Sequence, residues 1–355
     1  MNTLALLINQ MGLTPAEAAR RTGIAYATVW RHCNGTRAIS AEDAVRYERG
    51  LGISRHLLRP DSVGHSGVVR KRRRAPMNGF RIITADERME EQGGIKGVIF
   101  GPAKIGKTSL LWTLDPETTL FLDLEAGGLS VRGWGGDSLE IRDWETARDV
   151  ACFLGGPNPA MRPDQPYSQA HYDYVLGQYG DPATTEKYRT LFIDSITVAS
   201  RLCFQWASGQ PEAFSEKTGK PDSRGAYGLL GKEMIRWVTQ LQYIRGRNVW
   251  FVGLLDAKRD DFNREFFEPQ IEGAKTGLEL PGIVDQVVTM TELRTDDGAP
   301  YRAFVCSRPN PWNYPAGDRS GKLDMIEQPH LGGLMEKIHR GERKAISSYT
   351  YNLKG

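Results

Sequence analysis

The sequence Lys96-Gly-Val-Ile-Phe-Gly-Pro-Ala-Lys-Ile-Gly-Lys-Thr-Ser109 decides the fold class of this chain. It contains Gly101-x-x-x-x-Gly106-Lys107-Thr108, the phosphate-loop (P-loop) pattern, directly after an apolar run. The two glycines let the backbone curl so that its amide N–H groups point at phosphate oxygens. A helix expected over 107–113 adds the positive end of its dipole. The stretch therefore predicts a strand–loop–helix unit that binds a nucleotide.

The side chains of this loop have expected roles toward ATP and Mg²⁺. Lys107 supplies a positive charge to the β- and γ-phosphates, and the Thr108 hydroxyl is placed to ligate Mg²⁺. The alternative is a glycine-rich turn with a chance lysine, but the strand before the loop and the helix after it argue against that interpretation. The expected nucleotide contacts are Gly101, Pro102, Ala103, Lys104, Ile105, Gly106, Lys107, Thr108 and Ser109.

The composition is ordinary for a soluble protein of 355 residues, which is long enough for about two domains. No run of about 18 apolar residues is present, so we expect no membrane span. The N-terminus lacks the basic region and the cleavage site of a signal peptide. The four cysteines are scattered without C-x-x-C spacing, which indicates neither a disulfide framework nor a zinc site. We therefore expect a cytoplasmic protein.

Charge is unevenly distributed along the chain. Residues 1–76 contain 13 Lys/Arg against 5 Asp/Glu, a net charge of +8, which leaves −5 for the remainder. A basic head on a mildly acidic body indicates nucleic-acid contact by the head. The dense run Val69-Arg-Lys-Arg-Arg-Arg-Ala-Pro76 is typical of a flexible tether, and it would also follow a phosphate backbone without sequence preference.

Residues 14–35 have the pattern of two short helices joined by a glycine-containing turn. Thr14-Pro-Ala-Glu17 is a capping box with proline at the first helical position, and the second helix is expected over Tyr26–Cys33. The segment resembles the helix-turn-helix of the lambda repressor/Cro type, and its continuation to Asp61 resembles the YdaS-type branch. A helical domain without DNA binding is the alternative. The resemblance implies that the residues facing the major groove of duplex DNA are Tyr26, Ala27, Thr28 and Arg31.

From about Gly79 apolar runs alternate with helical patterns, which predicts an α/β fold with a mainly parallel sheet. An amphipathic helix near 229–245 places one apolar stripe in the core. The expected organisation is a helix-turn-helix domain over 1–61, a basic flexible linker over 62–78, an ATPase domain over 79–340 and a tail over 341–355. The expected strands are Gly97–Phe100, Thr118–Leu124, Thr190–Asp194, Val249–Leu254, Asp285–Thr291 and Tyr301–Cys306.

Two apolar strands end in carboxylates that define the class of ATPase. Thr190-Leu-Phe-Ile-Asp194 positions Asp194 to hold Mg²⁺ through water. Ser195 follows it, where ATPases of the AAA+ type usually carry the glutamate that activates water. Phe121-Leu-Asp-Leu-Glu125 supplies an acid at another strand end, and this arrangement resembles RecA-like ATPases. The resemblance implies that Glu125 is the catalytic base, with Asp123 as the second candidate; a polar strand end without catalytic duty is the alternative.

The last third of the chain narrows the resemblance. Segments 277–285, 301–304 and 316–324 look like the phage nucleotide-binding proteins, which are RecA-like ATPases grouped with single-strand annealing proteins. The resemblance covers roughly residues 78–340 and implies ATP hydrolysis with Mg²⁺, DNA as a partner, and a homo-oligomer in the form of a ring or filament. The chain departs from this pattern at Asp256, near which RecA-like proteins commonly carry a Gln or His that senses the γ-phosphate. It departs again in its helix-turn-helix.

Two segments are candidates for contact with single-stranded DNA, and both contain acids, so plain solvated loops are the alternative. Residues 256–267 offer Lys258 and Arg259 beside Phe262, and cations next to aromatic rings are what single strands bind. Residues 211–227 offer a second set of cations. The resemblance to RecA-like ATPases also implies that a neighbouring copy supplies an arginine to the transferring phosphoryl group. Arg319 is preferred over Arg308 for that role, and a surface arginine without such duty is the alternative.

Three functions remain open from the sequence. The first is a DNA-dependent ATPase of phage or prophage origin that binds single-stranded DNA in recombination or strand annealing, with a duplex-binding head. The second is an ATPase that coats duplex DNA, because a helix-turn-helix joined to an ATPase is also the layout of the phage Mu transposition ATPase. The third is a transcription regulator whose P-loop body senses a nucleotide.

Overall fold

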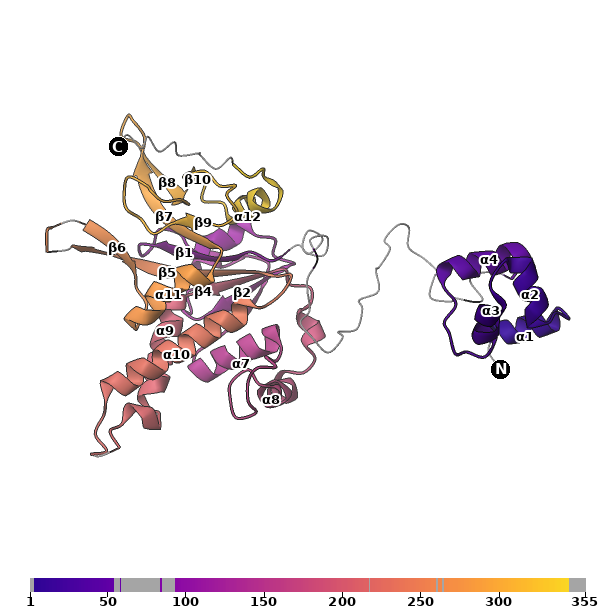
Figure 1. Ribbon diagram of the computed structural model, residues 1–355. Helices are drawn as coiled ribbons and strands as arrows, with labels where there is room; N and C mark the ends of the chain where they lie inside the picture. The colour runs from indigo at the N-terminus through magenta and orange to yellow at the C-terminus, as the bar shows by residue number, and fades with distance from the viewer. Residues whose placement is uncertain are drawn as a thin grey trace, which may run out of the picture. The chain divides into compact units, whose positions relative to one another are not determined.

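The structure is a computed structural model that describes residues 3–53, 58, 84, 93–216, 218–259, 261–263 and 265–344. The chain divides into two compact units, Met1–Ile82 and Ile83–Gly355 (Figure 1). The predicted linker and its basic run lie outside the described residues, as does the predicted tail from residue 345 onward. The domain boundaries drawn from the sequence stay predictions.

The first unit contains four helices in its described part: α1 (Thr3–Gln10), α2 (Pro15–Thr22), α3 (Tyr26–Cys33) and α4 (Ala41–Leu51). The capping box is present, because the Thr14 side chain accepts a hydrogen bond from the Glu17 amide at 3.2 Å. Gly23 ends α2 in the left-handed conformation, with φ 67°, which favours glycine. The two helices and the turn predicted from the sequence are therefore formed. Their packing is closed by a small core that includes Leu4, Ala18, Ile24, Val29 and Tyr47.

The second unit is built on a sheet of ten strands in the described residues, in the order β10-β8-β7-β1-β5-β4-β2-β3, with β6 paired to β5 and β9 to β7. The pairs among β7, β1, β5, β4, β2 and β3 are parallel, and the others are antiparallel. The strands are β1 (Lys96–Gly101), β2 (Thr119–Asp123), β3 (Asp137–Glu140), β4 (Thr190–Asp194), β5 (Asn248–Arg259), β6 (Glu265–Pro269), β7 (Gln286–Arg294), β8 (Pro300–Val305), β9 (Gly317–Asp318) and β10 (Ile326–Glu327).

Helices cover both faces of this sheet (Figure 1). One face carries the larger core, with α7, α9, α10 and α11, and the other carries η2, η3 and α12. The helices are η2 (Thr108–Thr113), η3 (Gly128–Val131), α7 (Trp144–Gly155), α8 (Gln169–Tyr179), η4 (Pro182–Thr185), α9 (Ile196–Ser208), η5 (Pro211–Ala213), α10 (Ser223–Gln242), α11 (Ala274–Ile283) and α12 (Leu331–Arg340). No helix in the described part of the chain is long and apolar enough to cross a membrane.

The predicted fold class is confirmed in its architecture: an α/β core with a mainly parallel sheet, preceded in the chain by a small all-α unit. All six predicted strands form, and the predicted amphipathic stripe is buried along α10. The helix predicted after the P-loop forms, but not as an α-helix. The segment 108–113 is a 3₁₀ helix, closed by bonds from the Leu110 amide to the Lys107 carbonyl and from the Leu114 amide to the Leu111 carbonyl.

The second correction concerns the end of β5. The strand was expected to end at Leu254, but it continues to Arg259 and pairs with β6. Antiparallel pairing with β6 satisfies the backbone groups that would otherwise need another partner. The segment 256–267, predicted as a loop, is therefore most of a β-hairpin.

The centre of the sheet depends on a glycine beneath a tryptophan. Gly97 on β1 is paired in register with Trp250 on β5, and the Trp250 indole is fully buried. A Cβ atom on residue 97 would lie 2.3 Å from that ring, which is far inside van der Waals contact. No other residue type fits there without moving the indole.

We expect Gly97→Ala to lower the free energy of unfolding by about 1–3 kcal/mol, because the extra methyl group overpacks the sheet. Chemical denaturation followed by tryptophan fluorescence measures this difference. The matched control is Gly177→Ala in α8, where an added Cβ meets no atom within 4 Å. That control should be neutral or stabilising, since alanine favours a helix over glycine. Equal unfolding midpoints for Gly97→Ala and the parent would contradict the proposed role of Gly97.

Candidate functional site

The P-loop leaves β1 between two neighbouring strands, and its two glycines are needed for different reasons. A Cβ on Gly101 would lie 2.4 Å from the Met290 carbonyl oxygen of β7, so the close approach of backbone requires glycine. Gly106 has φ 103°, a conformation that side chains strongly disfavour. Lys104 also has a positive φ of 64°, in the left-handed region. The loop is thus held in a tight curl between β1 and η2.

Lys107 lies across this curl. Its side chain is 9% exposed, and its ammonium donates to the carbonyl oxygens of Gly101 at 3.0 Å and Pro102 at 2.9 Å. Burial lowers the pKa of Lys107, while the nearby carboxylates of Asp194 and Glu125 act to raise it. The ammonium group therefore lies beside the P-loop backbone, where it can contact an anion bound by the loop.

The Thr108 hydroxyl and the Asp194 carboxylate meet at the end of this loop. The hydroxyl donates to Asp194 Oδ2 at 2.5 Å, although β5 lies between the strands that lead to the two residues. Asp194 is 3% exposed, and burial raises its pKa to about 7, against the lowering effect of the Thr108 hydrogen bond. A buried carboxylate that is paired with a hydroxyl and lies near a lysine is suited to a cation.

This donor set fits Mg²⁺, which prefers a few protein oxygens together with water and phosphate. Within the described residues, no group of three or more His, Cys, Asp or Glu could hold a metal ion. A cation at this site would therefore be held by the Thr108 and Asp194 oxygens, completed by the nucleotide and water. This arrangement is the one expected for a P-loop magnesium site.

Glu125 reaches the same edge of the sheet from β2. Asp123 and Asp194 are directly paired on β2 and β4, so Glu125 lies just beyond the Asp194 strand end. Ser195 Oγ donates to Glu125 Oε1 at 2.5 Å and accepts from the Val198 amide at 3.2 Å. Ser195 thus caps α9 and holds the Glu125 carboxylate in place. Sequence reasoning treated Ser195 only as a missing acid, and its positioning role depends on the pairing of β2 with β4.

Asp123, the second candidate base, is occupied by the turn that follows β2. Its Oδ1 accepts hydrogen bonds from the amides of Glu125 at 3.0 Å and Ala126 at 2.9 Å. These bonds stabilise a turn in which Ala126 has φ 56°. Asp123 therefore orients the backbone that carries Glu125, and Glu125, whose side chain is exposed, is the better placed of the two acids.

Arg319 lies at the opposite edge of the sheet from the P-loop of its own chain. Strand β9 pairs with Gln286 and Val287 at the beginning of β7, whereas the P-loop follows the end of the parallel strand β1. The Arg319 guanidinium donates to Asp285 Oδ1 at 3.4 Å and to the Gly282 carbonyl at 2.5 Å. The structure does not bring Arg319 to the nucleotide site of the same chain, and a role toward a neighbouring copy stays a prediction.

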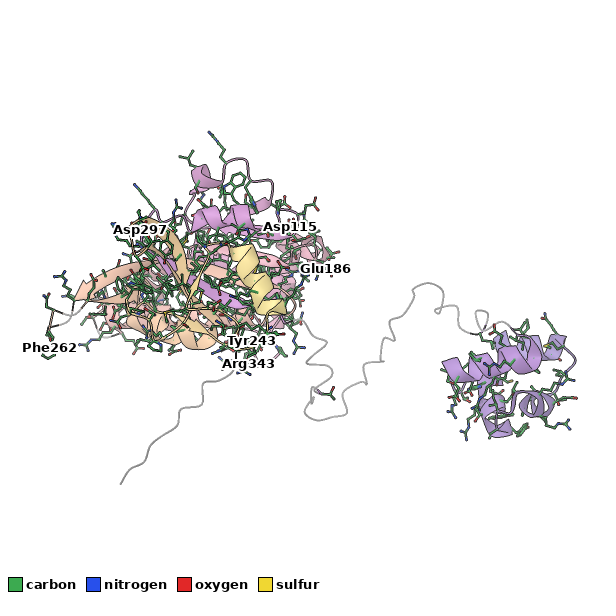
Figure 2. The ribbon with its side chains drawn as sticks, turned by 90° about the horizontal axis from the view of Figure 1, so that it is seen from above. Asp115, Glu186, Tyr243, Phe262, Asp297 and Arg343 are labelled. Atoms are coloured by element: carbon green, nitrogen blue, oxygen red, sulfur yellow. The ribbon has the colours of Figure 1, made fainter. Side chains whose placement is uncertain are left out.

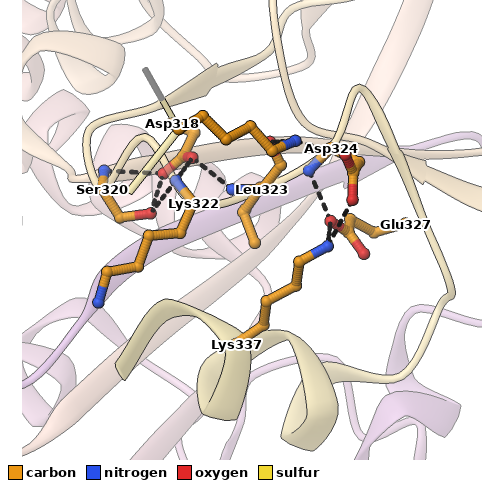
Figure 3. A network of polar contacts seen from close by, with 8 residues as sticks. Asp318, Ser320, Lys322, Leu323, Asp324, Glu327 and Lys337 are labelled. Atoms are coloured by element: carbon orange, nitrogen blue, oxygen red, sulfur yellow. Dashed lines mark hydrogen bonds and ion pairs between the residues drawn. The ribbon is translucent and has the colours of Figure 1, made fainter. Parts of the chain in front are cut away.

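The neighbouring residue Asp318 organises this turn (Figure 3). Its carboxylate accepts hydrogen bonds from the amides of Ser320, Lys322 and Leu323 at 2.8–2.9 Å, and another from the Ser320 hydroxyl. The segment that carries the family resemblance thus has a structural task in the described chain. Arg308, the other arginine considered, donates through Nε to the Tyr314 carbonyl at 3.2 Å.

The predicted single-strand contacts lie on the hairpin β5–β6. Phe262 is at its tip, 79% exposed (Figure 2). Lys258 Nζ pairs with Glu268 at 2.6 Å, and Arg259 Nη1 donates to Asn263 Oδ1 at 3.3 Å. Phe267, at the end of this segment, packs its ring on Tyr314 with centroids 4.4 Å apart.

The predicted duplex contacts lie together on α3. Tyr26, Ala27 and Arg31 are exposed, Thr28 is half-buried, and Val29 is buried in the core of the head. Trp30, which sequence reasoning did not assign, is 50% exposed one turn after Tyr26. These contacts with DNA stay predictions, as do those of the second segment, 211–227, in which Lys217 lies outside the described residues.

Comparison with known proteins finds one protein family and several distant structures. Residues 93–320 match a family described as AAA domain. An ATPase from the type III secretion system of pathogenic bacteria is 16% identical, with a TM-score of 0.28, and the alignment covers 56% of this chain and 51% of that one. The chain thus spans about half of the length of that ATPase. No curated protein matches the sequence.

Two further structures are similarly distant. The RadB recombinase is 10% identical, with a TM-score of 0.28, over 61% of this chain and 81% of that one. The P4 protein from bacteriophage phi13 is 15% identical, with a TM-score of 0.23. The alignment covers 59% of this chain and 58% of that protein.

We expect Lys107→Ala to weaken ATP binding by at least about tenfold, which corresponds to about 1.4 kcal/mol, because the buried ammonium is lost from the loop. Titration with a fluorescent nucleotide measures the change. Lys232→Ala is the control, since Lys232 is an exposed lysine on α10 of the same unit. Unchanged affinity in Lys107→Ala would rule out this lysine as the phosphate-binding group.

Proposed function

This chain belongs to the family described as AAA domain, and on that premise we propose that it is a Mg²⁺-dependent ATP hydrolase that acts on DNA. The proposed task is to bind single-stranded DNA in recombination or strand annealing, in a phage or prophage. The observation that carries the proposal is the convergence of Lys107, Thr108–Asp194 and Glu125 at one edge of the parallel sheet.

Each of these residues has a distinct part in hydrolysis. Lys107 exchanges its two carbonyl partners for oxygens of the β- and γ-phosphates, with Thr108 and Asp194 holding Mg²⁺. The metal supplies charge neutralisation on the phosphate oxygens. Glu125 accepts a proton from the attacking water while the water oxygen bonds to the γ-phosphorus and the bond to the β–γ bridging oxygen breaks. Ser195 keeps the Glu125 carboxylate directed at that water.

Strand β5 supports the dependence on DNA. It pairs with β1, which leads to the P-loop, and with β4, which ends in Asp194. The same strand continues into the hairpin that carries Lys258, Arg259 and Phe262. A displacement of the hairpin on binding DNA would therefore be transmitted along one strand to a point between the two halves of the nucleotide site.

The residues just after β6 also contact α9, the helix that precedes the second predicted DNA segment in the chain. The Glu272 amide donates to Ser200 Oγ of α9 at 2.9 Å, and Arg201 Nη2 donates to Gln270 Oε1 at 3.3 Å. In the proposal the hairpin and the segment 211–227 act together on one strand of DNA. The active form is a homo-oligomer, a ring or filament, in which Arg319 or Arg308 of one copy serves the nucleotide site of the next.

Coating of duplex DNA is the second candidate function. It is favoured by the exposed set on α3, which joins Tyr26 and Trp30 to the basic side chain of Arg31. Aromatic and cationic side chains on one face of a recognition helix suit contact with a duplex. In the first function this head would recruit the ATPase to duplex sites, whereas in the second it would be the main DNA contact.

We expect Glu125→Gln to retain ATP binding but to lower turnover by about 10²-fold or more, because the amide cannot accept a proton. Steady-state phosphate release and nucleotide titration give the two quantities separately. Glu117→Gln, an exposed acid on the same unit, is the control. Turnover that barely changes in Glu125→Gln would show that the water is activated by another group.

A second experiment separates the functions by measuring ATP hydrolysis with no DNA, single-stranded DNA and duplex DNA. We expect single strands to stimulate more than duplex, also after removal of residues 1–76, and this deletion to remove most duplex affinity. Phe262→Ala should weaken single-strand binding by about 1–3 kcal/mol if one base stacks on the ring. Tyr243→Ala is the control, since Tyr243 is a 74% exposed ring at the end of α10.

The other outcomes identify the other functions. Stronger activation of the truncated chain by duplex would favour the transposition type of ATPase. If neither DNA changes hydrolysis, the chain is a nucleotide-sensing regulator.

A further inference from the structure

Arg302 is placed by β8 on the same face of the sheet as the P-loop. Side chains alternate along a strand, so Arg302 shares its face with Phe304. Phe304 is buried in the cluster that contains Leu110 and Leu111 of η2, directly after the P-loop. In register Arg302 stands opposite Glu292, near the end of β7, and β7 is the neighbour of β1. The segment 301–304 is one of those that carry the resemblance to phage nucleotide-binding proteins, but the sequence assigned Arg302 no role at the nucleotide site.

The Arg302 guanidinium lies against the peptide unit that joins Ile105 and Gly106. Its Nη1 donates to the Ile105 carbonyl oxygen at 3.3 Å, across 197 residues of sequence. A Cβ atom on Gly106 would stand 2.8 Å from the same nitrogen. Glycine at position 106 therefore leaves room for the Arg302 guanidinium and also allows the positive φ of the backbone turn.

The geometry of that peptide unit links the arginine to the phosphate site. In a trans peptide the C=O of one residue and the N–H of the next lie in one plane and point in opposite directions. An arginine that holds the Ile105 carbonyl on the outside of the loop thereby directs the Gly106 N–H to the inside, where P-loops bind phosphate. Because glycine flanks this peptide, its rotation is otherwise weakly restricted.

We propose that Arg302 is a positioning residue of the nucleotide site: it fixes the Ile105–Gly106 peptide so that the Gly106 N–H is presented to the β-phosphate of the nucleotide. This inference rests on the proposed function, because it requires that the loop binds a nucleotide. It assigns a part in nucleotide affinity to β8, an antiparallel strand between β7 and β10.

The experiment compares ADP and ATP binding in the full-length chain and in Arg302→Ala, by calorimetric titration. We expect the Kd of both nucleotides to rise by about tenfold and by the same factor, because both place a β-phosphate in the loop. Arg302→Lys, which keeps a donor on a long side chain, should recover part of the loss. The KM for ATP should rise in Arg302→Ala while kcat at saturation is kept.

The matched control is Arg294→Ala, since Arg294 lies on the same β7–β8 hairpin and donates to the Gly298 carbonyl at its turn. That variant should bind both nucleotides like the parent. A loss confined to ATP would overturn the proposal in favour of direct contact with the γ-phosphate. Unchanged affinities in Arg302→Ala would overturn it as well, while leaving the proposed function intact. A parent chain that binds neither nucleotide would instead refute the proposed function itself.

Discussion

The hydrogen bond between the Thr108 hydroxyl and the Asp194 carboxylate is the constraint on which the nucleotide site depends. It joins the end of the P-loop, which follows β1, to the end of β4, although β5 lies between these two strands. Asp194 is almost completely buried at this point. Burying a carboxylate is unfavourable unless a cation or several donors compensate it, and this is why its pKa is raised to about 7. Lys107 is one compensating charge beside this carboxylate, and the proposed Mg²⁺ ion would be the second.

The strand between these two ends, β5, gives the molecule its second organising feature. Its pairing with β1 and β4 is continuous through the buried centre of the sheet, where Trp250 packs over Gly97. Beyond the sheet it carries an exposed hairpin whose tip bears Phe262. A rigid strand that links a nucleotide site with an exposed hairpin is a direct physical route for coupling hydrolysis to a bound polymer.

Resemblance and geometry assign different roles to the segment around Asp318. The resemblance made Arg319 a candidate for action on a neighbouring copy, whereas within the chain Asp318 closes a turn and Arg319 is bonded to Asp285 and Gly282 (Figure 3). Arg302, in the resembling segment 301–304 but with no role assigned from the sequence, donates a hydrogen bond to the P-loop. The contact between Arg302 and Ile105 joins residues 197 positions apart, so it depends on the order of the strands in the sheet and not on a local motif.

The sequence by itself determined the strand–loop–helix unit, the six main strands and the acids at their ends, because these depend on local patterns: a glycine spacing, apolar runs and the residue that ends each run. It did not determine the 3₁₀ form of 108–113, the extension of β5 into a hairpin, or the short strands β3, β6, β9 and β10, which are stabilised by backbone pairing with another strand rather than by a local pattern. Only the tertiary structure decided that Ser195 orients Glu125 and that Arg302 reaches Ile105. The physical reason is that each of these contacts needs two strand ends to be brought within a few ångströms, and the order of strands in a sheet is set by packing rather than by any one stretch of sequence.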